Sequence, residues 1–185
     1  VLFRSLRSVY AFERRQAVDH PGTRKARDAE FRDYVAWRLS PQTGPVLRNY
    51  QMRMLSGRYP GNDDDEQAAA ARATSEIFPV LGLVERFDET MVLLEERLRD
   101  AFPDIDLAYV RQNSSGGDAA DLTRSSVEDE LGDLLDDVHA ANARDIALYE
   151  HAAGRFEQQG TALADADRRL AAFRERCEAL RAAAS

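Results

Sequence analysis

A short segment in the middle of the chain constrains the fold more than any other. The run from Val80 to Val84 is too brief for a buried helix and is typical of a strand covered on both faces. Asp88 follows as the expected N-cap of a helix. Apolar residues then recur at helical spacing, namely Met91, Leu94, Leu98 and Phe102. A strand, a polar turn and an amphipathic helix make one crossover unit of a parallel sheet, so the segment predicts an α/β fold.

Helical periodicity dominates the rest of the chain. Apolar spacing predicts helices over residues 6–18, 29–39, 46–55 and 67–77. Residues 19–22 are expected to break the first helix, and Gly57 is expected to end the third. Residues 107–110 suit a second, short extended piece. A later helical stripe comprises Val127, Leu131, Leu134 and Val138, and Asn142 is expected to cap the helix after it.

Composition excludes several classes of function. The chain has 185 residues, of which 44% are hydrophobic and 31% charged, and this is typical of one globular domain or part of a larger one. Its net charge of −8 disfavours nucleic-acid binding, although a local arginine pocket for an anion is compatible with it. Cys177 is the only cysteine, so neither an intrachain disulfide nor a cysteine metal cluster is expected. No apolar run is long enough to cross a bilayer, and the three histidines lack ligand spacing.

Four phrases resemble, in order, those of the carbohydrate sulfotransferase family, which includes heparan sulfate 2-O-sulfotransferase-like enzymes and bacterial relatives. Ser8-Val9-Tyr10 matches the tail of "R-D-P-x-x-R-x-x-S-x-Y", and Asn49 to Gly57 matches "N-x-Q-x-R-x-L-x-G". The segment ending in Thr90 is similar to "V-G-L-x-E-R-F-D-E-S", and residues 142–149 are similar to "N-x-x-D-x-x-L-Y". The resemblance implies a truncated α/β P-loop sulfotransferase fold, here a mostly helical fragment with one or two parallel strands.

The resemblance also implies a reaction. Family members transfer a sulfuryl group from 3′-phosphoadenosine 5′-phosphosulfate (PAPS) to a sugar hydroxyl, without a metal. Sulfuryl transfer needs cationic or backbone N–H groups around the donor oxygens, which a phosphate-binding loop supplies. In the family this loop and the candidate general base precede the Ser8 phrase, so the catalytic residues are expected upstream of residue 1. The fragment alone is therefore predicted to bind PAPS poorly and to be inactive.

The beginning of the chain departs from the family pattern. Residues 1–5 correspond to one reading frame of a sequencing adapter and are predicted to be a scar, the alternative being a sequence that simply starts mid-chain. Ser5 stands where the family has an arginine that holds the donor phosphate. Residues 6–160 are then predicted to be the C-terminal part of a sulfotransferase domain, and residues 161–185 an amphipathic helix.

Five residues are candidates for ligand contact. Ser8 is predicted at a helix start, where its hydroxyl would meet a phosphate oxygen of PAPS. Arg111 and Asn113 precede a glycine loop that closes over the nucleotide in relatives, although a solvated charge is the alternative. His20 is a candidate contact for the acceptor sugar or else a turn histidine. Arg53 either faces the acceptor or pairs with a neighbouring carboxylate.

The last segment suggests a rival function. Leu163, Leu170 and Cys177 are spaced by seven, as are Ala166, Phe173 and Leu180, which is an a/d seam. The seam predicts a helix docked on its own domain, and the alternative is weak self-association, which would make the chain a non-catalytic interaction module. The expected partner is otherwise a carbohydrate acceptor, with no nucleic acid and no membrane segment. The expected compartment is the bacterial cytoplasm, or the Golgi lumen if the source is eukaryotic.

Overall fold

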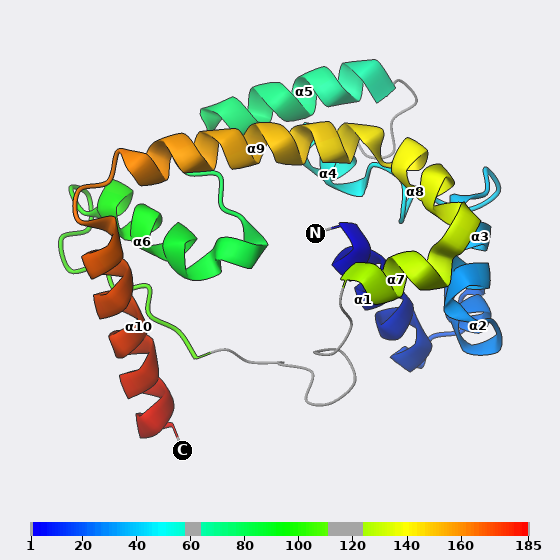
Figure 1. The fold of residues 1–185 in the computed structure, drawn as a ribbon, viewed down its shortest axis with the longest axis horizontal. Helices are drawn as coiled ribbons and strands as arrows, with labels where there is room; N and C mark the ends of the chain where they lie inside the picture. Colours follow the sequence, from blue (N-terminus) through cyan, green and yellow to red (C-terminus); the bar gives the residue numbers. More distant parts are fainter. Residues whose placement is uncertain (1, 58–63, 111–123, 185) are drawn as a thin grey trace. The chain divides into compact units, whose positions relative to one another are not determined.

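The computed structural model describes residues 2–57, 64–110 and 124–184, and the regular structure within these ranges is entirely helical (Figure 1). The chain forms two compact units. Unit 1 comprises residues 1–71 and 115–147, and unit 2 comprises residues 72–114 and 148–185. Two helices, α5 (Asp64–Ile77) and α9 (Ala143–Thr161), each contribute residues to both units.

Unit 1 is a helical cluster around an aromatic core. Its helices are α1 (Leu2–Arg15), α2 (Pro21–Asp28), α3 (Phe31–Leu39), α4 (Tyr50–Ser56), α7 (Arg124–Leu131) and α8 (Leu135–Ala141), with a 3₁₀ turn, η2 (Gly132–Leu134), between the last two. The ring centroid of Tyr10 lies 5.5 Å from that of Phe31 and 5.1 Å from that of Tyr34. The predicted stripe is confirmed, because Val127, Leu131 and Val138 are buried in this core.

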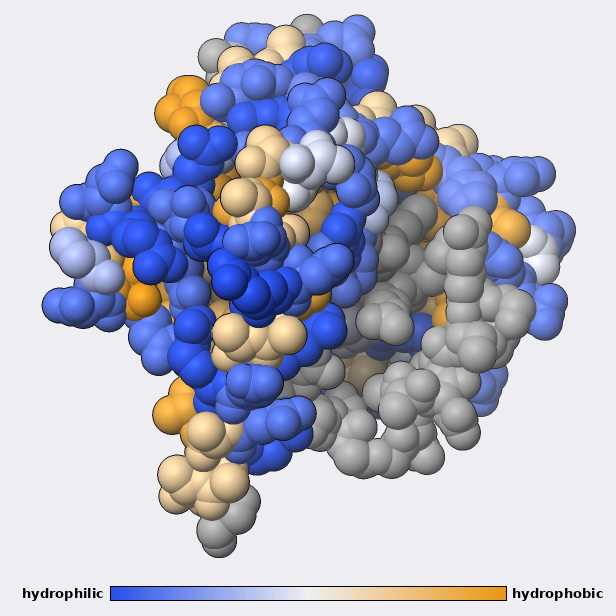
Figure 2. Space-filling model, turned by 60° about the vertical axis from the view of Figure 1, so that its left-hand side comes forward, coloured by the Kyte–Doolittle hydropathy of each residue, from blue (hydrophilic) through white to orange (hydrophobic). Residues whose placement is uncertain are grey.

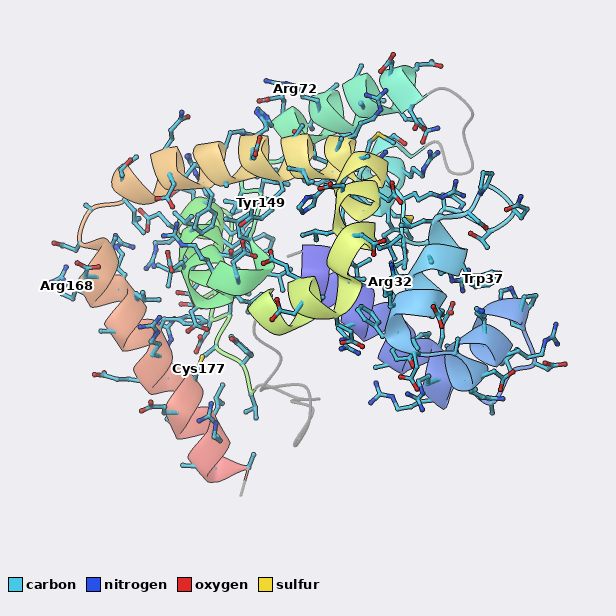
Figure 3. All side chains as sticks on the ribbon, turned by 45° about the vertical axis from the view of Figure 1, so that its right-hand side comes forward. Arg32, Trp37, Arg72, Tyr149, Arg168 and Cys177 are labelled. Carbon is cyan, nitrogen blue, oxygen red and sulfur yellow. The ribbon has the colours of Figure 1, made fainter. Side chains whose placement is uncertain are left out.

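Charged side chains of unit 1 fasten α7 to α1 and α3. The Arg7 guanidinium lies 3.9 Å from the ring centroid of Phe31 and pairs with Glu130 of α7. Arg32, labelled in Figure 3, donates from Nε to the carbonyl of Leu131 at 3.2 Å and pairs with Asp133. These contacts hold the end of α7 against the aromatic core, so α7 is positioned by residues about one hundred positions earlier.

Helix α2 begins where the sequence predicts a break. Pro21 occupies the first turn, where a missing N–H has no consequence because helix-starting N–H groups lack intrahelical partners. His20 is the N-cap, and its Nδ1 accepts the Gly22 N–H at 3.1 Å. Thr23 Oγ1 accepts the His20 N–H at 3.0 Å, which completes a capping box. The Pro-Gly pair therefore starts a helix here.

Unit 2 contains η1 (Val84–Arg86), α6 (Phe87–Leu98), α10 (Ala166–Ala183), and residues 72–77 of α5 and 148–161 of α9. Its small core joins Val80, Leu83, Leu93, Ala152 and Phe156. Arg86, rather than the predicted Asp88, is the N-cap residue of α6. Asp88 instead accepts the hydroxyl of Tyr109 at 2.8 Å and pairs with Arg174 at 3.2 Å.

The predicted α/β fold is wrong for the described residues. Residues 80–83 adopt no regular structure, and Val84 begins a 3₁₀ turn with its side chain 82% exposed. Side chains, not a neighbouring strand, satisfy this backbone: Gln159 donates to the carbonyl of Pro79 at 2.7 Å, and Thr90 Oγ1 accepts the Leu83 N–H at 3.2 Å. Burial of Val80 and Leu83 against α6 and α9 explains the apolar run without a sheet.

The second predicted extended piece, residues 107–110, is not a strand either. Its backbone is held by side chains of two helices, since the N–H of Leu107 donates to Glu95 Oε1 at 2.9 Å and that of Tyr109 to Cys177 Sγ at 3.4 Å. The Tyr109 ring centroid lies 5.0 Å from that of Phe87 and 6.3 Å from that of Phe173. Cys177 of α10 (Ala166–Ala183), labelled in Figure 3, thus contacts this segment.

Helix α10 docks within its own unit. Phe173 is fully buried, while Leu163, Leu170 and Cys177 are half-buried, and α10 packs against α6. Arg176 donates to both oxygens of the buried Glu95, at 2.6 and 2.8 Å. Of the seam, Leu180 is the residue that projects, with 43% of its surface exposed.

The face shown in Figure 2 is mostly hydrophilic, with hydrophobic residues in small groups. None of the helices formed by the described residues has the length and apolar character that a membrane span requires.

Candidate functional site

The predicted ligand contacts lie on separate elements of unit 1 or outside the described residues. Ser8 is exposed within α1 and not at its start, because α1 begins at Leu2. It therefore lacks the free backbone N–H groups of a helix terminus, on which the predicted phosphate contact depended. Arg111 and Asn113 fall outside the described residues. His20 uses Nδ1 to cap α2, which leaves a role in sugar binding as a prediction.

Arg53 pairs with a carboxylate. Its Nη2 lies 2.5 Å from Asp64 Oδ1, Nη1 donates to Gln67 Oε1 at 3.3 Å, and Nε donates to the carbonyl of Arg48 at 3.4 Å. The Arg53 side chain is only 11% exposed. The sequence left open whether Arg53 faces the acceptor or pairs with a neighbouring carboxylate, and these contacts describe the pairing. The guanidinium joins α4 to the first turn of α5.

Two asparagines from distant parts of the chain hold each other's backbone. Asn142 Oδ1 accepts the N–H of Asn49 at 3.1 Å, and its Nδ2 donates to the carbonyls of Leu47 and Val138, both at 2.9 Å. Asn49 Oδ1 accepts the N–H of Arg144 at 3.1 Å and that of Asp145 at 3.2 Å, at the start of α9. Both side chains are buried, so these bonds are shielded from water.

Asp145 completes this arrangement, which we call the α4–α9 junction (Asn49, Asn142 and Asp145). Its two carboxylate oxygens accept the N–H of Gln51 at 2.9 Å and that of Met52 at 2.7 Å, in the first turn of α4. Burial raises the pKa of the Asp145 carboxyl above its ordinary value, although the N–H donors oppose that shift. Asn49 adopts a left-handed conformation with φ of 48°, which asparagine tolerates better than most residues.

The α4–α9 junction gives a structural reason for the polar residues in two of the sequence phrases. Asn49 belongs to the phrase at residues 49–57, and Asn142 and Asp145 belong to the phrase at residues 142–149. Each residue caps an element supplied by the other phrase. Asn142 directly precedes α9 as predicted, but its side chain does not cap that helix, because it bonds the N–H of Asn49 and the carbonyls of Leu47 and Val138. Asn49 caps α9 instead, and Asp145 caps α4 and not its own helix.

Charged residues of the third phrase, the segment ending in Thr90, are also engaged in structural contacts. Arg86 pairs with Glu89 and Glu157, and Glu85 accepts the hydroxyl of Tyr149. The bond to Glu85 is the largest contribution that raises the pKa of Tyr149, with burial adding to it. Tyr149, labelled in Figure 3, is 37% exposed.

A buried charged cluster in unit 1 was not predicted from the sequence. The Tyr34 hydroxyl donates to Glu13 Oε2 at 2.6 Å, Arg38 Nε donates to the Tyr34 oxygen at 3.1 Å, and Arg38 pairs with Glu13. Burial opposes ionisation of Glu13, but the bonds from Arg38 and Tyr34 outweigh it and lower the pKa of the carboxyl. Burial and the bond to Glu13 raise the pKa of Tyr34 far above its ordinary value. Tyr34 and Arg38 lie 21 and 25 positions after Glu13, and no local sequence signal joins them to it.

Gly22 makes this cluster fit. A Cβ on Gly22 would lie 2.0 Å from an Arg38 guanidinium nitrogen and 2.7 Å from Glu13 Oε2. The first turn of α2 therefore approaches the Arg38–Glu13 pair as closely as only a glycine permits. The arrangement neutralises one buried charge with another and joins α1, α2 and α3.

The described residues contain no group of three His, Cys, Asp or Glu side chains arranged to hold a metal ion. Chemically, the charged residues above act in pairs, which suits them to positioning helices. For PAPS, the exposed hydroxyl of Ser8 remains the one predicted contact among the described residues, and its role stays a prediction.

Comparison with known proteins gives little functional information. No family model matches the chain. A protein of Archaeoglobus fulgidus, described only as an uncharacterized protein, is 27% identical to the chain over 158 residues, which are 83% of this chain. The match spans 62% of that relative's own length. No solved structure matches.

Proposed function

We propose that this chain is a helical, structural part of a PAPS-dependent carbohydrate sulfotransferase, and that it does not transfer sulfate on its own. The observation that carries the proposal is the α4–α9 junction. Asn49 on one side, and Asn142 and Asp145 on the other, were singled out by resemblance to that family, and they bond across 93 to 96 positions of sequence. Accidental matches to two unrelated helices would have no reason to select residues that satisfy each other.

The same contacts indicate what this part of the protein does. Asn49, Arg53, Asn142 and Asp145 satisfy backbone groups or neighbouring side chains within unit 1. Their polar groups are therefore used to fix helix positions, and donor chemistry is assigned to residues outside this sequence. The described residues form helices and no sheet, which supports a structural role for this part of the protein.

A ligand titration tests the proposal. Thermal unfolding of the chain should not shift with adenosine 3′,5′-bisphosphate or PAPS, because ligand that binds only the folded state raises its stability with concentration. A sulfuryl-transfer assay on mixed saccharides should likewise give no turnover. Saturable stabilisation by the bisphosphate, or turnover by the chain alone, would contradict the structural role. A protein whose coding sequence is extended upstream of residue 1 should bind PAPS and transfer the sulfuryl group. Failure of this extended protein to bind PAPS would overturn the proposed family.

A second candidate is the non-catalytic interaction module, and exposed apolar side chains of unit 2 favour it. Ile77 is 80% exposed, Val84 82% and Phe102 59%. Self-association through α10 is less favoured, because Phe173 of its seam is already buried. Analytical ultracentrifugation of the chain and of Leu180→Asp separates these ideas. A dimer that Leu180→Asp dissociates would support association through α10, and a dimer that survives it would place the contact elsewhere.

A further inference from the structure

Helix α10 lies against α6 within unit 2 and has a single apolar anchor (Figure 1). Phe173 is the one buried residue among the 18 of α10, and its ring centroid lies 6.3 Å from that of Tyr109. Leu170 and Cys177, one turn away on either side, are only half-buried. A helix docked through an apolar face would bury such a residue in about every turn. The apolar part of this contact is therefore small for the length of the helix.

Arg176 makes the strongest polar contact of α10. It donates to both carboxylate oxygens of Glu95, at 2.6 and 2.8 Å, and its Nε lies 3.2 Å from Asp106 Oδ1. Glu95 is buried, but the Arg176 side chain is 41% exposed. Salt in the solvent therefore reaches one partner of this pair.

Two further arginines extend the polar contact along α10. Arg169 Nη1 lies 2.5 Å from Glu96 Oε2, and Arg174 Nε lies 3.2 Å from Asp88 Oδ2. The four side chains are between 29% and 57% exposed. Ion pairs with this exposure each contribute little, and salt screens them. Their summed contribution to the docking of α10 therefore depends on ionic strength.

The overall charges of the two surfaces agree with these pairs. Residues 85–106, which contain α6, include eight acidic and three basic residues, whereas α10 has five arginines and three acidic residues. A basic helix thus covers an acidic segment, and the attraction between them weakens as salt is added.

The connection between α9 and α10 can act as a hinge. It comprises residues 162–165 and ends at Asp165, the N-cap residue of α10, whose φ is 55°. This left-handed conformation is uncommon for a residue other than glycine. Leu163, just before it, packs on the small core of unit 2. A change in the backbone angles of Asp165 therefore moves α10 while Leu163 stays in place.

We propose that α10 is a strap that closes on α6 at low ionic strength and opens about Asp165 as ionic strength rises. Salt weakens the pairs of Arg169, Arg174 and Arg176, and Phe173 alone is too small an anchor to keep the strap closed. Opening uncovers the Tyr109 ring and the Cys177 thiol. The proposal does not depend on the function proposed above, because neither PAPS nor sulfuryl transfer enters it.

Cys177 reports the opening, because it is the only cysteine in the sequence and its Sγ accepts the Tyr109 N–H while the strap is closed. Alkylation by N-ethylmaleimide, an uncharged reagent, is timed in about 0.05 M and about 1 M NaCl. Each rate is divided by that of the urea-unfolded chain at the same salt, which removes effects on the thiol itself. The relative rate should rise at least about fivefold with salt. A relative rate that does not change with salt would overturn the proposal.

Hydrogen exchange separates opening of the strap from unfolding of unit 2. Amides of residues 166–183 should lose protection as salt is added, because an undocked helix of this length frays. Amides of residues 148–161 in α9 should keep theirs. An equal loss of protection in both helices would mean that the unit opens as a whole, and the strap would be excluded.

Two double variants locate the charges that close the strap. Arg169→Gln with Arg174→Gln should raise the relative alkylation rate at low salt at least about threefold and reduce its response to added salt. Arg72→Gln with Arg97→Gln removes the same charge from exposed positions of α5 and α6 and should behave like the wild type. Circular dichroism checks that both variants remain helical. Equal rates in the two double variants would contradict a strap held by these pairs.

Discussion

Asp145 Oδ1 lies 2.7 Å from the backbone N–H of Met52, so a carboxylate near the start of α9 caps the N-terminus of α4. A helix N-terminus carries a partial positive charge and unpaired N–H groups, and an acidic side chain satisfies both. Asn49, directly before α4, makes no side-chain cap of its own helix and is instead directed at α9. Each helix is therefore capped by the other.

Removing this carboxylate should destabilise unit 1. Asp145→Ala leaves the N–H groups of Gln51 and Met52 without a partner, and we expect the free energy of unfolding to fall by about 1–2 kcal/mol. Urea denaturation followed by circular dichroism measures this. Asp136→Ala, which changes an exposed aspartate on α8, is the matched control and should alter stability much less. Equal effects of the two substitutions would show that the cap contributes nothing.

The cluster of Glu13, Tyr34 and Arg38 predicts an acid-sensitive contribution to stability. The pKa of Glu13 is lowered in the folded state from an ordinary 4.5, so the unfolded chain takes up a proton there first as pH falls. Its contribution is present above pH 4.5 and is lost as pH drops through the lowered value. Stability measured by urea denaturation between about pH 6 and 3 should decline less steeply in Glu13→Gln than in the wild type. Parallel pH profiles would contradict this.

Tyr34 should not ionise where ordinary tyrosines do. Burial and the hydrogen bond to Glu13 raise its pKa, whereas an exposed tyrosine titrates near pH ~10. An ultraviolet titration of the folded chain should therefore give the same phenolate absorbance around that pH for the wild type and Tyr34→Phe. A lower amplitude in Tyr34→Phe would mean that Tyr34 ionises normally. The same variant should lose about 1–2 kcal/mol of stability, because the Arg38 and Glu13 groups lose a partner.

Phe173 should be the residue of α10 that matters most for docking. Its side chain is fully buried against α6 and Tyr109, and truncation to alanine should cost about 3–5 kcal/mol by leaving a cavity. Leu180→Ala, at the exposed end of the same seam, should cost less than about 1 kcal/mol. Hydrogen exchange of α10 amides reports the docking directly. Unchanged protection in Phe173→Ala would show that α10 is held by its ion pairs instead.

Elements governed by local periodicity or a local turn were predictable from the sequence. Val127, Leu131 and Val138 keep one apolar face, and burial follows from that face. Gly57 adopts φ of 65° at the end of α4, a conformation that glycine reaches without strain, so the predicted stop is confirmed. Phe31 is 1% exposed and Trp37 packs on the same core, in line with the apolar spacing of the helix predicted over residues 29–39.

The prediction of a strand at Val80 was wrong for a physical reason. A short apolar run only indicates burial, and whether it becomes a strand depends on a neighbour that can share backbone hydrogen bonds. Among the described residues those partners are the side chains of Thr90, Arg155 and Gln159, which periodicity does not reveal. A Cβ on Gly82 would lie 2.3 Å from Thr90 Cγ2, so the close approach of α6 also depends on that glycine.

Functional residues were the least predictable part. The phrases quoted for the resemblance contain Asn49, Asn142 and Asp145, but a phrase could not give their contacts, which span 93 or more positions of sequence. The Glu13–Tyr34–Arg38 cluster depends on side chains from two separate helices, and it leaves no motif in the sequence.

The division of the chain into interleaved units has a consequence for biosynthesis. Unit 1 needs residues 115–147 to complete it, and the ribosome must first release residues 72–114, which belong to unit 2. Asn49 leaves the ribosome long before Asn142 and Asp145, so α4 lacks its cap during much of translation. The aromatic residues of α1 and α3 are also exposed during this time, because the apolar residues of α7 and α8 that cover them are not yet made. A nascent chain of this kind is expected to need a chaperone, or to remain soluble as an open intermediate, until α8 and α9 leave the exit tunnel.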